Sequence, residues 1–198
     1  MMSEKFDQEI QTMCAKEFAR IKPSLLIVSG ISKSPVPVVL YAGVACAGVS
    51  IAIFGCMLSS IREDMALTTT QAGLCQAVYF VGHLLGALLT GRLMGSWSTR
   101  GCWLLGLGAT VLGGVLTGVP SLPVLMIGRL AAGFGLSASI LFASAAIVTM
   151  FPNRTGVMLN LMHAVVAGAA ALTLTFGQSL GTALGSWSQV LWVSAILG

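Results

Sequence analysis

The chain has 198 residues, of which 56% are hydrophobic and only 8% are charged, and its formal net charge is +4. A soluble domain carries about 25% charged residues because water must wet its surface. This composition, with a mean hydropathy of +0.94, therefore excludes a soluble globular protein. We predict a membrane protein.

The positive charge does not indicate a nucleic-acid partner. Five of the ten Lys and Arg residues lie in the first 33 residues, interleaved with acidic residues, and the other five are single arginines. A basic patch with interleaved aromatic residues, the usual signature of nucleic-acid binding, is not formed. We expect the basic residues to set the membrane topology, with the lipid bilayer as the partner and no nucleic acid.

The cysteines and histidines predict neither a disulfide framework nor a metal site. The five cysteines show no C-x-x-C spacing, and His83 and His163 stand alone in the sequence. No H-E-x-x-H or G-x-S-x-G motif occurs, and no acidic residues cluster within the apolar segments. We therefore expect no enzyme, no catalytic residue, no cofactor and no metal.

Residues 1–37 are expected to form a cytoplasmic N-terminal arm and linker. Charges run through the first 22 residues, which excludes a signal peptide. Apolar residues recur at near-helical spacing as far as Ile21, and Pro23 disfavours helix at the residue before it. The arm is either an interfacial helix or a loosely ordered tail. The stretch SGISKSPVP (29–37) is typical of a linker.

Residues 38–198 predict an all-α membrane protein, a polytopic transmembrane helix bundle. A helix that crosses a hydrocarbon core of about 30 Å needs roughly 20 apolar residues. The sixth apolar segment is too short, so we expect the chain to be a fragment or to be completed by another polypeptide. The predicted spans cover about residues 38–59, 73–94, 101–119, 122–150, 156–180 and, in part, 187–198.

The distribution of basic residues predicts the orientation. With the N-terminus inside, the cytoplasmic segments hold the five basic residues of the arm together with Arg92, Arg100 and Arg154. The outer segments hold only Arg62, which two acidic residues follow. Cytoplasmic loops of membrane proteins carry an excess of Lys and Arg. We therefore predict a multi-pass protein of the plasma (cytoplasmic) membrane with a cytoplasmic N-terminus.

Arg129 is the only charged residue between Gly101 and Asn153, and it lies inside the fourth predicted span. An intramembrane charge is rare and costs at least about 2.5–3.5 kcal/mol, and a guanidinium stays protonated. Arg129 either snorkels to the outer surface or acts inside the bundle. Because the spans hold no carboxylate, an inward Arg129 needs backbone carbonyls, water, an acidic group from elsewhere or an anionic solute.

Other polar residues also form stripes on the predicted helices. At 100° per residue, Gln76, Tyr79 and His83 share a narrow arc of the second span, and Asn160 and His163 share a face of the fifth. These stripes suggest a shared interior surface. Gln76 and Tyr79 are also compatible with anchoring at the outer interface, and the other three with hydrogen bonding between helices.

Glycines at short spacings are interpreted as helix-packing positions, because small residues let transmembrane helices approach closely. GFG at 133–135 is not a dinucleotide fingerprint, since no strand precedes it. The glycines assigned to helix packing are Gly133, Gly135, Gly177, Gly181 and Gly185.

Several motifs follow one another along the predicted spans. Residues 67–93, LTTTQAGLCQAVYFVGHLLGALLTGRL, look like the first outer loop and second span of the major facilitator superfamily. Residues 91–100, GRLMGSWSTR, resemble its cytoplasmic motif between spans two and three. Gly91 and Arg100 match the motif, whereas Gly95 stands in the place of its Asp. The resemblance implies a cytoplasmic gating motif that lacks the family's Asp.

The later spans carry further resemblances to the same family. Arg129, Gly133 and Gly135 match an R-x-x-x-G-x-G pattern that is frequent in its fourth span. Residues 160–172, NLMHAVVAGAAAL, look like the fifth span of sugar-type members, and SWSQVLWVSAILG (186–198) is similar to the start of the sixth.

The resemblance implies the N-terminal half of a secondary active transporter, with the sixth span incomplete. The family fold has twelve spans in two six-span halves, which rock about a midplane site in alternating access. The expected partner is then a second six-span half, in the same longer chain or separate. The expected substrate is a small polar solute. The residues expected to line the substrate or coupling cavity are Arg129, His83, Gln76, Tyr79, Asn160 and His163.

Two questions stay open at the level of sequence. The fifth-span resemblance favours a sugar-like solute, whereas the cation of Arg129 favours an anion. If the transporter is a proton symporter or antiporter, only His83 and His163 titrate usefully within the spans. The alternative function is a truncated bundle that acts as a membrane scaffold or partner subunit without transport activity.

Overall fold

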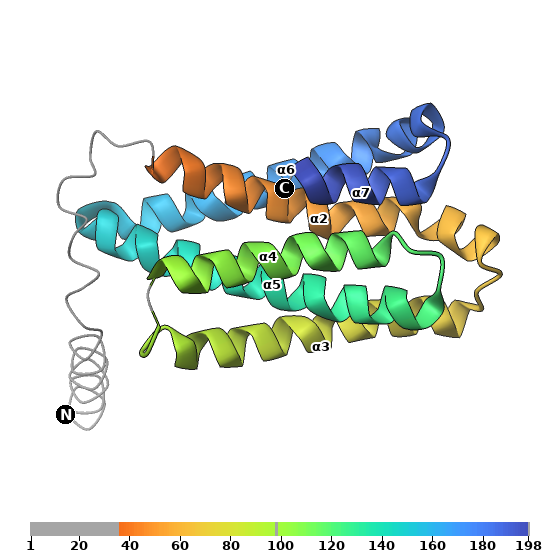
Figure 1. Cartoon of the computed structure of the whole chain (residues 1–198). Helices are drawn as coiled ribbons and strands as arrows, with labels where there is room; N and C mark the ends of the chain where they lie inside the picture. The colour runs from red at the N-terminus through yellow and green to blue at the C-terminus, as the bar shows by residue number, and fades with distance from the viewer. Residues whose placement is uncertain (1–35, 98, 198) are drawn as a thin grey trace, which may run out of the picture.

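The computed structural model describes residues 36–97 and 99–197. Almost all of the predicted arm and linker, and the side chain of Arg100, lie outside this part. The described residues form an α-helical bundle with no strand (Figure 1), which confirms the predicted fold class. The helices are α2 (Val36–Asp64), α3 (Thr69–Leu93), α4 (Thr99–Thr117), α5 (Leu122–Met150), the 3-10 turn η3 (Pro152–Arg154), α6 (Thr155–Leu184) and α7 (Trp187–Leu197).

Four of these helices are long and apolar enough to cross a membrane. They are α2, α3, α5 and α6, with 29, 25, 29 and 30 residues. Helix α4 is also apolar but has 19 residues, and α7 has 11. Successive helices run back and forth, so that their ends gather at the two ends of the bundle (Figure 1).

The first connection differs from the sequence prediction. The first two predicted spans, about 38–59 and 73–94, leave residues 60–72 between them, but α2 continues to Asp64 and α3 already begins at Thr69. The early start of α3 has a local cause, because Thr68 and Gln71 form a capping box. The Thr68 hydroxyl accepts a hydrogen bond from the Gln71 backbone N–H at 3.2 Å, and the Gln71 side chain accepts one from the Thr68 N–H at 2.9 Å.

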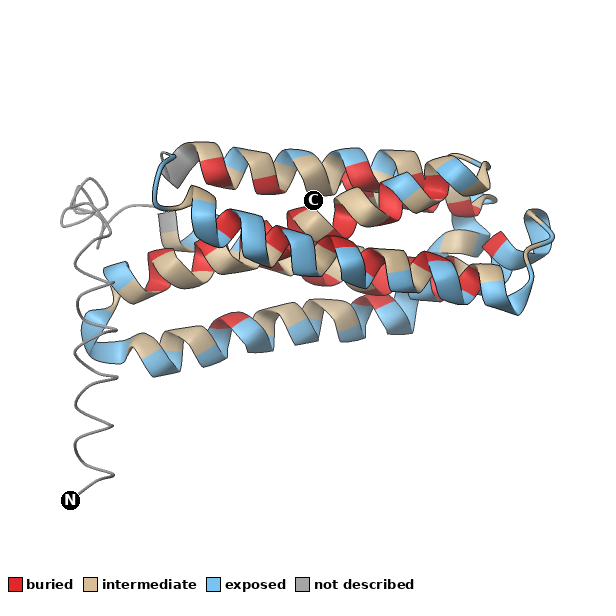
Figure 2. Cartoon of the chain, turned by 90° about the horizontal axis from the view of Figure 1, so that it is seen from below, coloured by how far each residue is buried: buried red, intermediate tan, exposed pale blue. Residues whose placement is uncertain are grey.

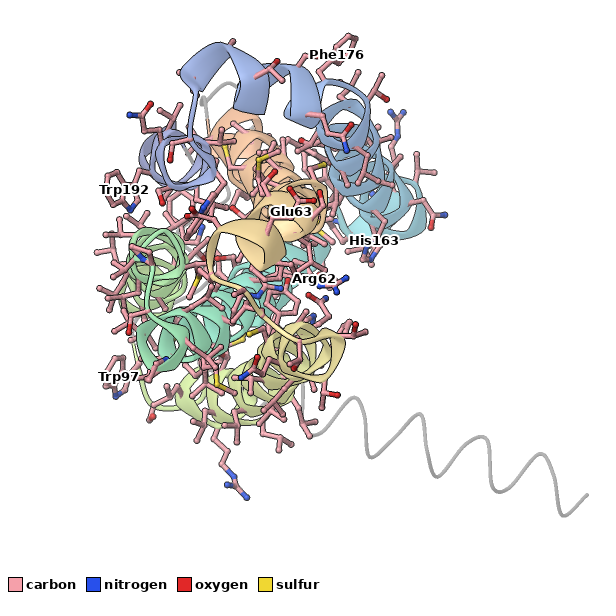
Figure 3. All side chains as sticks on the ribbon, turned by 90° about the vertical axis from the view of Figure 1, so that its right-hand side faces the viewer. Arg62, Glu63, Trp97, His163, Phe176 and Trp192 are labelled. Atoms are coloured by element: carbon pink, nitrogen blue, oxygen red, sulfur yellow. The ribbon has the colours of Figure 1, made fainter. Side chains whose placement is uncertain are left out.

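The bundle consists of two groups of helices. Helix α5 packs closely against α3 and α4, and α2 packs closely against α6, while α7 contacts both α4 and α2. By contrast, α2 and α3 scarcely touch each other. The view along the bundle in Figure 3 shows α2 between α6 and the α3–α5 pair. The polar residues of α3 and α5 therefore lie beside a helix of the other group.

Glycines allow the closest helix contacts. A Cβ atom at Gly133 of α5 would clash with the backbone carbonyl of Tyr79 on α3, and one at Gly135 would clash with the backbone and hydroxyl of Thr110 on α4. On α6, a Cβ atom at Gly177 would lie 3.0 Å from the Cys56 sulfur of α2. Small residues at such positions let transmembrane helices pack backbone to backbone.

Gly185 does not belong to this set of packing glycines. It follows the last residue of α6 with φ 72°, and nothing lies within 4 Å of a Cβ built there. Its N–H bonds to the Gly181 carbonyl, so it ends the helix in the left-handed conformation that glycine adopts readily. The four-residue spacing from Gly181 therefore reflects a helix cap.

The outside of the bundle is apolar. Large hydrophobic side chains are exposed along α3 and α6 in particular, while buried residues lie on the inner sides of the helices (Figure 2). Among the 30 residues of α6, only Met162, Thr173 and Gly177 are buried. Such a surface suits hydrocarbon, where every backbone polar group must be satisfied within the helix.

Candidate functional site

Arg129 lies inside the bundle. It is the eighth residue of α5, about 10 Å along the axis from the start of that helix. Only 2% of its surface is exposed, and it is the largest of the fully buried side chains among the described residues. Arg129 therefore does not snorkel to the surface.

Two aromatic rings cover the guanidinium of Arg129. Its central carbon lies 3.9 Å from the ring centroid of Phe54 on α2 and 4.2 Å from that of Tyr79 on α3. Both rings are buried, with 1% and 3% of their surface exposed. Aromatic faces attract cations, by as much as about 2 kcal/mol when the pair is desolvated. The two rings thus stabilise the cation inside the bundle.

The third neighbour of Arg129 is the amide of Gln76. An Nη2–H of Arg129 donates a hydrogen bond to Oε1 of Gln76, with 2.8 Å between the two heavy atoms. Hydrogen bonds from an ionised donor are roughly twice as strong as neutral ones. Gln76 itself is half-buried. It joins the buried cation to a less buried flank of α3.

Gly133 explains why these groups can meet. It lies one helical turn after Arg129, and the absence of a Cβ lets α3 approach α5 at Tyr79. Gly82 and Gly86 of α3 allow similarly close contacts with Leu130 and Phe134. The R-x-x-x-G pattern therefore places a cation on α5 and opens the space for the α3 residues that hold it.

No acidic side chain pairs with Arg129 in the part of the chain that the structure describes. The acidic residues there are Glu63 and Asp64, which are exposed at the end of α2. Two polar atoms of the cluster have no hydrogen-bond partner among the described residues, namely Nε of Arg129 and the hydroxyl of Tyr79. The site is thus a cation held by rings and one amide, with spare hydrogen-bonding capacity.

The remaining predicted cavity residues lie apart from this cluster. His83 is half-buried on α3, one turn beyond Tyr79, whereas Asn160 and His163 are exposed on α6. None of these three side chains hydrogen bonds to another residue that the structure describes. In the end-on view of Figure 3, His163 lies on the side of α6 that is turned toward α3. The structure therefore groups Arg129, Gln76 and Tyr79 and leaves the α6 residues on a separate, open face.

The predicted gating motif lies at the opposite end of the bundle from Arg129. Gly91 is exposed near the end of α3, and a Cβ atom there would meet open space. The side chain of Arg100, at the start of α4, lies outside the described residues. The gating role of these two residues stays a prediction.

Sequence reasoning missed two contacts. Phe54 was not identified, although it is the one aromatic residue in the second half of its span and lies at a depth similar to Arg129. Trp187 of α7 donates its indole N–H to Asp64 Oδ2 at 2.9 Å, which links the end of α2 to the start of α7. Matching the depths of aromatic and charged residues across spans could have suggested the first contact but not the second.

The fold and the site together define a multi-pass membrane protein with a buried polar cluster between its helices. Comparison with known proteins is consistent with this class. A family model described as Major Facilitator Superfamily matches residues 40–198. The chain therefore belongs to the major facilitator superfamily, as the sequence motifs predicted.

A curated relative supports the same assignment. The chain is 30% identical over 168 residues to a chloramphenicol resistance protein of Streptomyces lividans. The aligned region covers 82% of this chain but 42% of the relative. The chain thus spans less than half the length of this relative.

Proposed function

We propose that this chain is the N-terminal six-helix half of a secondary active transporter that moves a small polar solute across the cytoplasmic membrane by alternating access. The observation that carries this proposal is the buried cluster of Arg129, Gln76 and Tyr79. Intramembrane charges are expensive and are typical of substrate or ion pathways. A bundle that served only as a scaffold would gain nothing from a buried cation without a counter-ion.

The open face of α6 supports a second six-helix half as the partner. Asn160, His163 and Gln178 are exposed on that helix and are separated by small alanines. Polar side chains that face hydrocarbon are costly, so we propose that the second half covers this face and encloses a polar cavity there. His83 and His163 are the candidates for proton coupling within the cavity.

The name of the Streptomyces lividans relative suggests which solute to test first. We propose that the transporter exports chloramphenicol or a compound of similar chemistry, an uncharged molecule with several hydrogen-bond acceptor oxygens. The burial of Arg129 between two rings favours such a solute over a simple anion, because the cation has no open face to offer.

Export can be tested with the natural polypeptide that contains these residues. It would be expressed in a chloramphenicol-sensitive bacterium, and the accumulation of radiolabelled chloramphenicol would be measured with and without a protonophore. We expect lower accumulation in expressing cells and loss of that difference when the protonophore is added. Equal accumulation in expressing and control cells, with the protein present in the membrane, would contradict the choice of solute.

A further inference from the structure

We infer that Gln76, rather than Arg129, is the residue of this cluster that contacts the solute, and that it does so through its amide NH2 group. Arg129 is then a positioning residue that acts through Gln76. This inference rests on the proposed transport function and specifies the chemistry of its site. The solute should then carry at least one hydrogen-bond acceptor that faces α3.

Arg129 is too enclosed to meet a solute itself. Phe54 and Tyr79 cover the guanidinium at 3.9 and 4.2 Å from its central carbon, and the residue is 2% exposed. Because only 2% of the residue is exposed, a solute could touch the guanidinium only after buried groups around it had moved. Gln76, by contrast, is half-buried and lies at the edge of the cluster.

The bond from Arg129 fixes which end of the Gln76 amide points away. A guanidinium has only donors, so it can bind only the oxygen of the amide. That oxygen accepts from Arg129 Nη2 at 2.8 Å, and the NH2 group therefore lies at the far end of the amide. Within the described part of the chain, no residue accepts a hydrogen bond from that NH2 group. Two donors are thus held in a set orientation without a partner.

The flank of α3 that carries Gln76 borders the tight α3–α5 contact. On a helical wheel, Gln76 and His83 lie about 20° apart, beside the stripe of Tyr79, Gly82 and Gly86 that packs against α5. Few residues of α2 approach α3, and Gln76 and His83 are both half-buried, so this flank is partly open. A solute between the groups of helices would meet the Gln76 NH2 group first.

Oriented donors of this kind select solutes by their acceptors. A site built to hydrogen bond a polar group discriminates strongly against an analogue that lacks the group, because the donors of the site then stay unpaired. Carbonyl, nitro, ether and hydroxyl oxygens all satisfy the requirement, and a formal negative charge is not needed. This accounts for a cation in the site of a transporter whose solute is uncharged.

The substitution Gln76→Glu separates the two roles. A carboxylate at position 76 keeps an acceptor for Arg129 but removes both donors. We expect the KM for chloramphenicol to rise at least tenfold while the thermal stability of the purified protein stays equal or increases. The matched control is Gln71→Glu on the same helix, which preserves the capping box and should leave the KM within twofold. An unchanged KM in Gln76→Glu would overturn the inference.

A double-mutant cycle tests whether Arg129 acts through Gln76. We expect Arg129→Met to raise the KM about tenfold when Gln76 is present, and by less than twofold in a Gln76→Ala background. Multiplicative effects would show that Arg129 meets the solute directly, which would overturn the inference. Arg129→Lys serves as the milder variant if Arg129→Met does not reach the membrane, and the melting temperature reports purely structural damage.

A third measurement is independent of the solute. In a variant without native cysteines, Gln76→Cys should react with a water-soluble maleimide, whereas Leu74→Cys, on the apolar side of α3, should not. If Gln76→Cys does not react, the flank is closed to solutes and the inference is wrong. If labelling succeeds but the wild type does not transport chloramphenicol, the solute in the proposed function is wrong, whereas the accessibility of position 76 still supports the inference.

Discussion

At the scale of single residues, Arg129 shows how a membrane helix keeps a permanent cation without a carboxylate. Its guanidinium meets Phe54, Tyr79 and Gln76, which come from two different helices. The rings offer their negative faces and the amide offers its oxygen, so the positive charge is solvated by protein groups. The NH2 group at the other end of this amide is thereby held in a fixed orientation on the flank of α3.

The ring of Phe54 should therefore contribute more than its hydrophobic area. We expect Phe54→Leu to lower the free energy of unfolding by about 2 kcal/mol, because it removes a desolvated cation–π contact as well as packing. Thermal unfolding of the purified protein in detergent measures this loss. The control is Phe176→Leu, at a ring on α6 that is 58% exposed, where the change should be below about 0.5 kcal/mol. Equal losses at both positions would argue against the cation–π contact.

At the scale of helices, glycine decides how near α3 and α5 come to each other. Gly133 of α5 meets the backbone of Tyr79, and Gly82 and Gly86 of α3 meet the backbone of Leu130 and Phe134. Because one of these contacts lies a single turn from Arg129, the separation of the helices also sets the distance from the cation to its partners.

Gly133→Ala should disturb both the fold and the site. The added Cβ would clash with the Tyr79 carbonyl and push α3 away, so we expect a loss of about 1–3 kcal/mol in unfolding free energy and a decrease in transport. Gly108→Ala on α4 adds a methyl group to open space and should be neutral or slightly stabilising. Thermal unfolding and transport assays at equal protein levels check both expectations. Wild-type stability and wild-type transport in Gly133→Ala would refute the role of this glycine.

At the scale of the whole molecule, charge separates the two ends of the bundle. Arg92 and Arg154 lie at the end where α3 and α5 finish, and Arg62, Glu63 and Asp64 lie at the other end. These are opposite ends of the bundle (Figure 1), so we expect them to face opposite sides of the membrane. The excess of positive charge predicts that the first of them is cytoplasmic.

Cysteine labelling in intact cells tests this orientation. In a variant without native cysteines, an impermeant maleimide added outside should label Glu63→Cys and should label Asn153→Cys only after the cells are opened. Both positions are exposed, so burial does not decide the result. The reverse pattern would place the N-terminus outside and contradict the proposed topology.

The sequence was more informative about helices than about contacts between them. Apolar length predicted the bundle, and α5 covers the same residues, 122–150, as the predicted fourth span. Local polar chemistry was harder to read, because the capping box at Thr68 starts α3 before the predicted second span and shortens the first connection. The glycine spacing on α6 did not reveal that Gly185 lies beyond the end of the helix.

Part of the candidate site could also be predicted from the sequence. The polar stripe on α3 and the isolated Arg129 could be found from helical periodicity and from the cost of an intramembrane charge. The position of Phe54 over the guanidinium depends on the relative depth and rotation of α2 and α5, which no local pattern encodes. The separation of Asn160 and His163 from the cluster likewise depends on helix packing.

The most direct test of the account is chloramphenicol export by the natural polypeptide with Arg129→Ala, compared with the wild type at equal amounts in the membrane. The structure places Arg129 at the centre of the polar cluster, with Gln76 bound to it. We expect at least a tenfold lower export rate for Arg129→Ala and a normal rate for Arg62→Ala, at the exposed end of α2. An export rate for Arg129→Ala equal to that of the wild type would contradict this expectation.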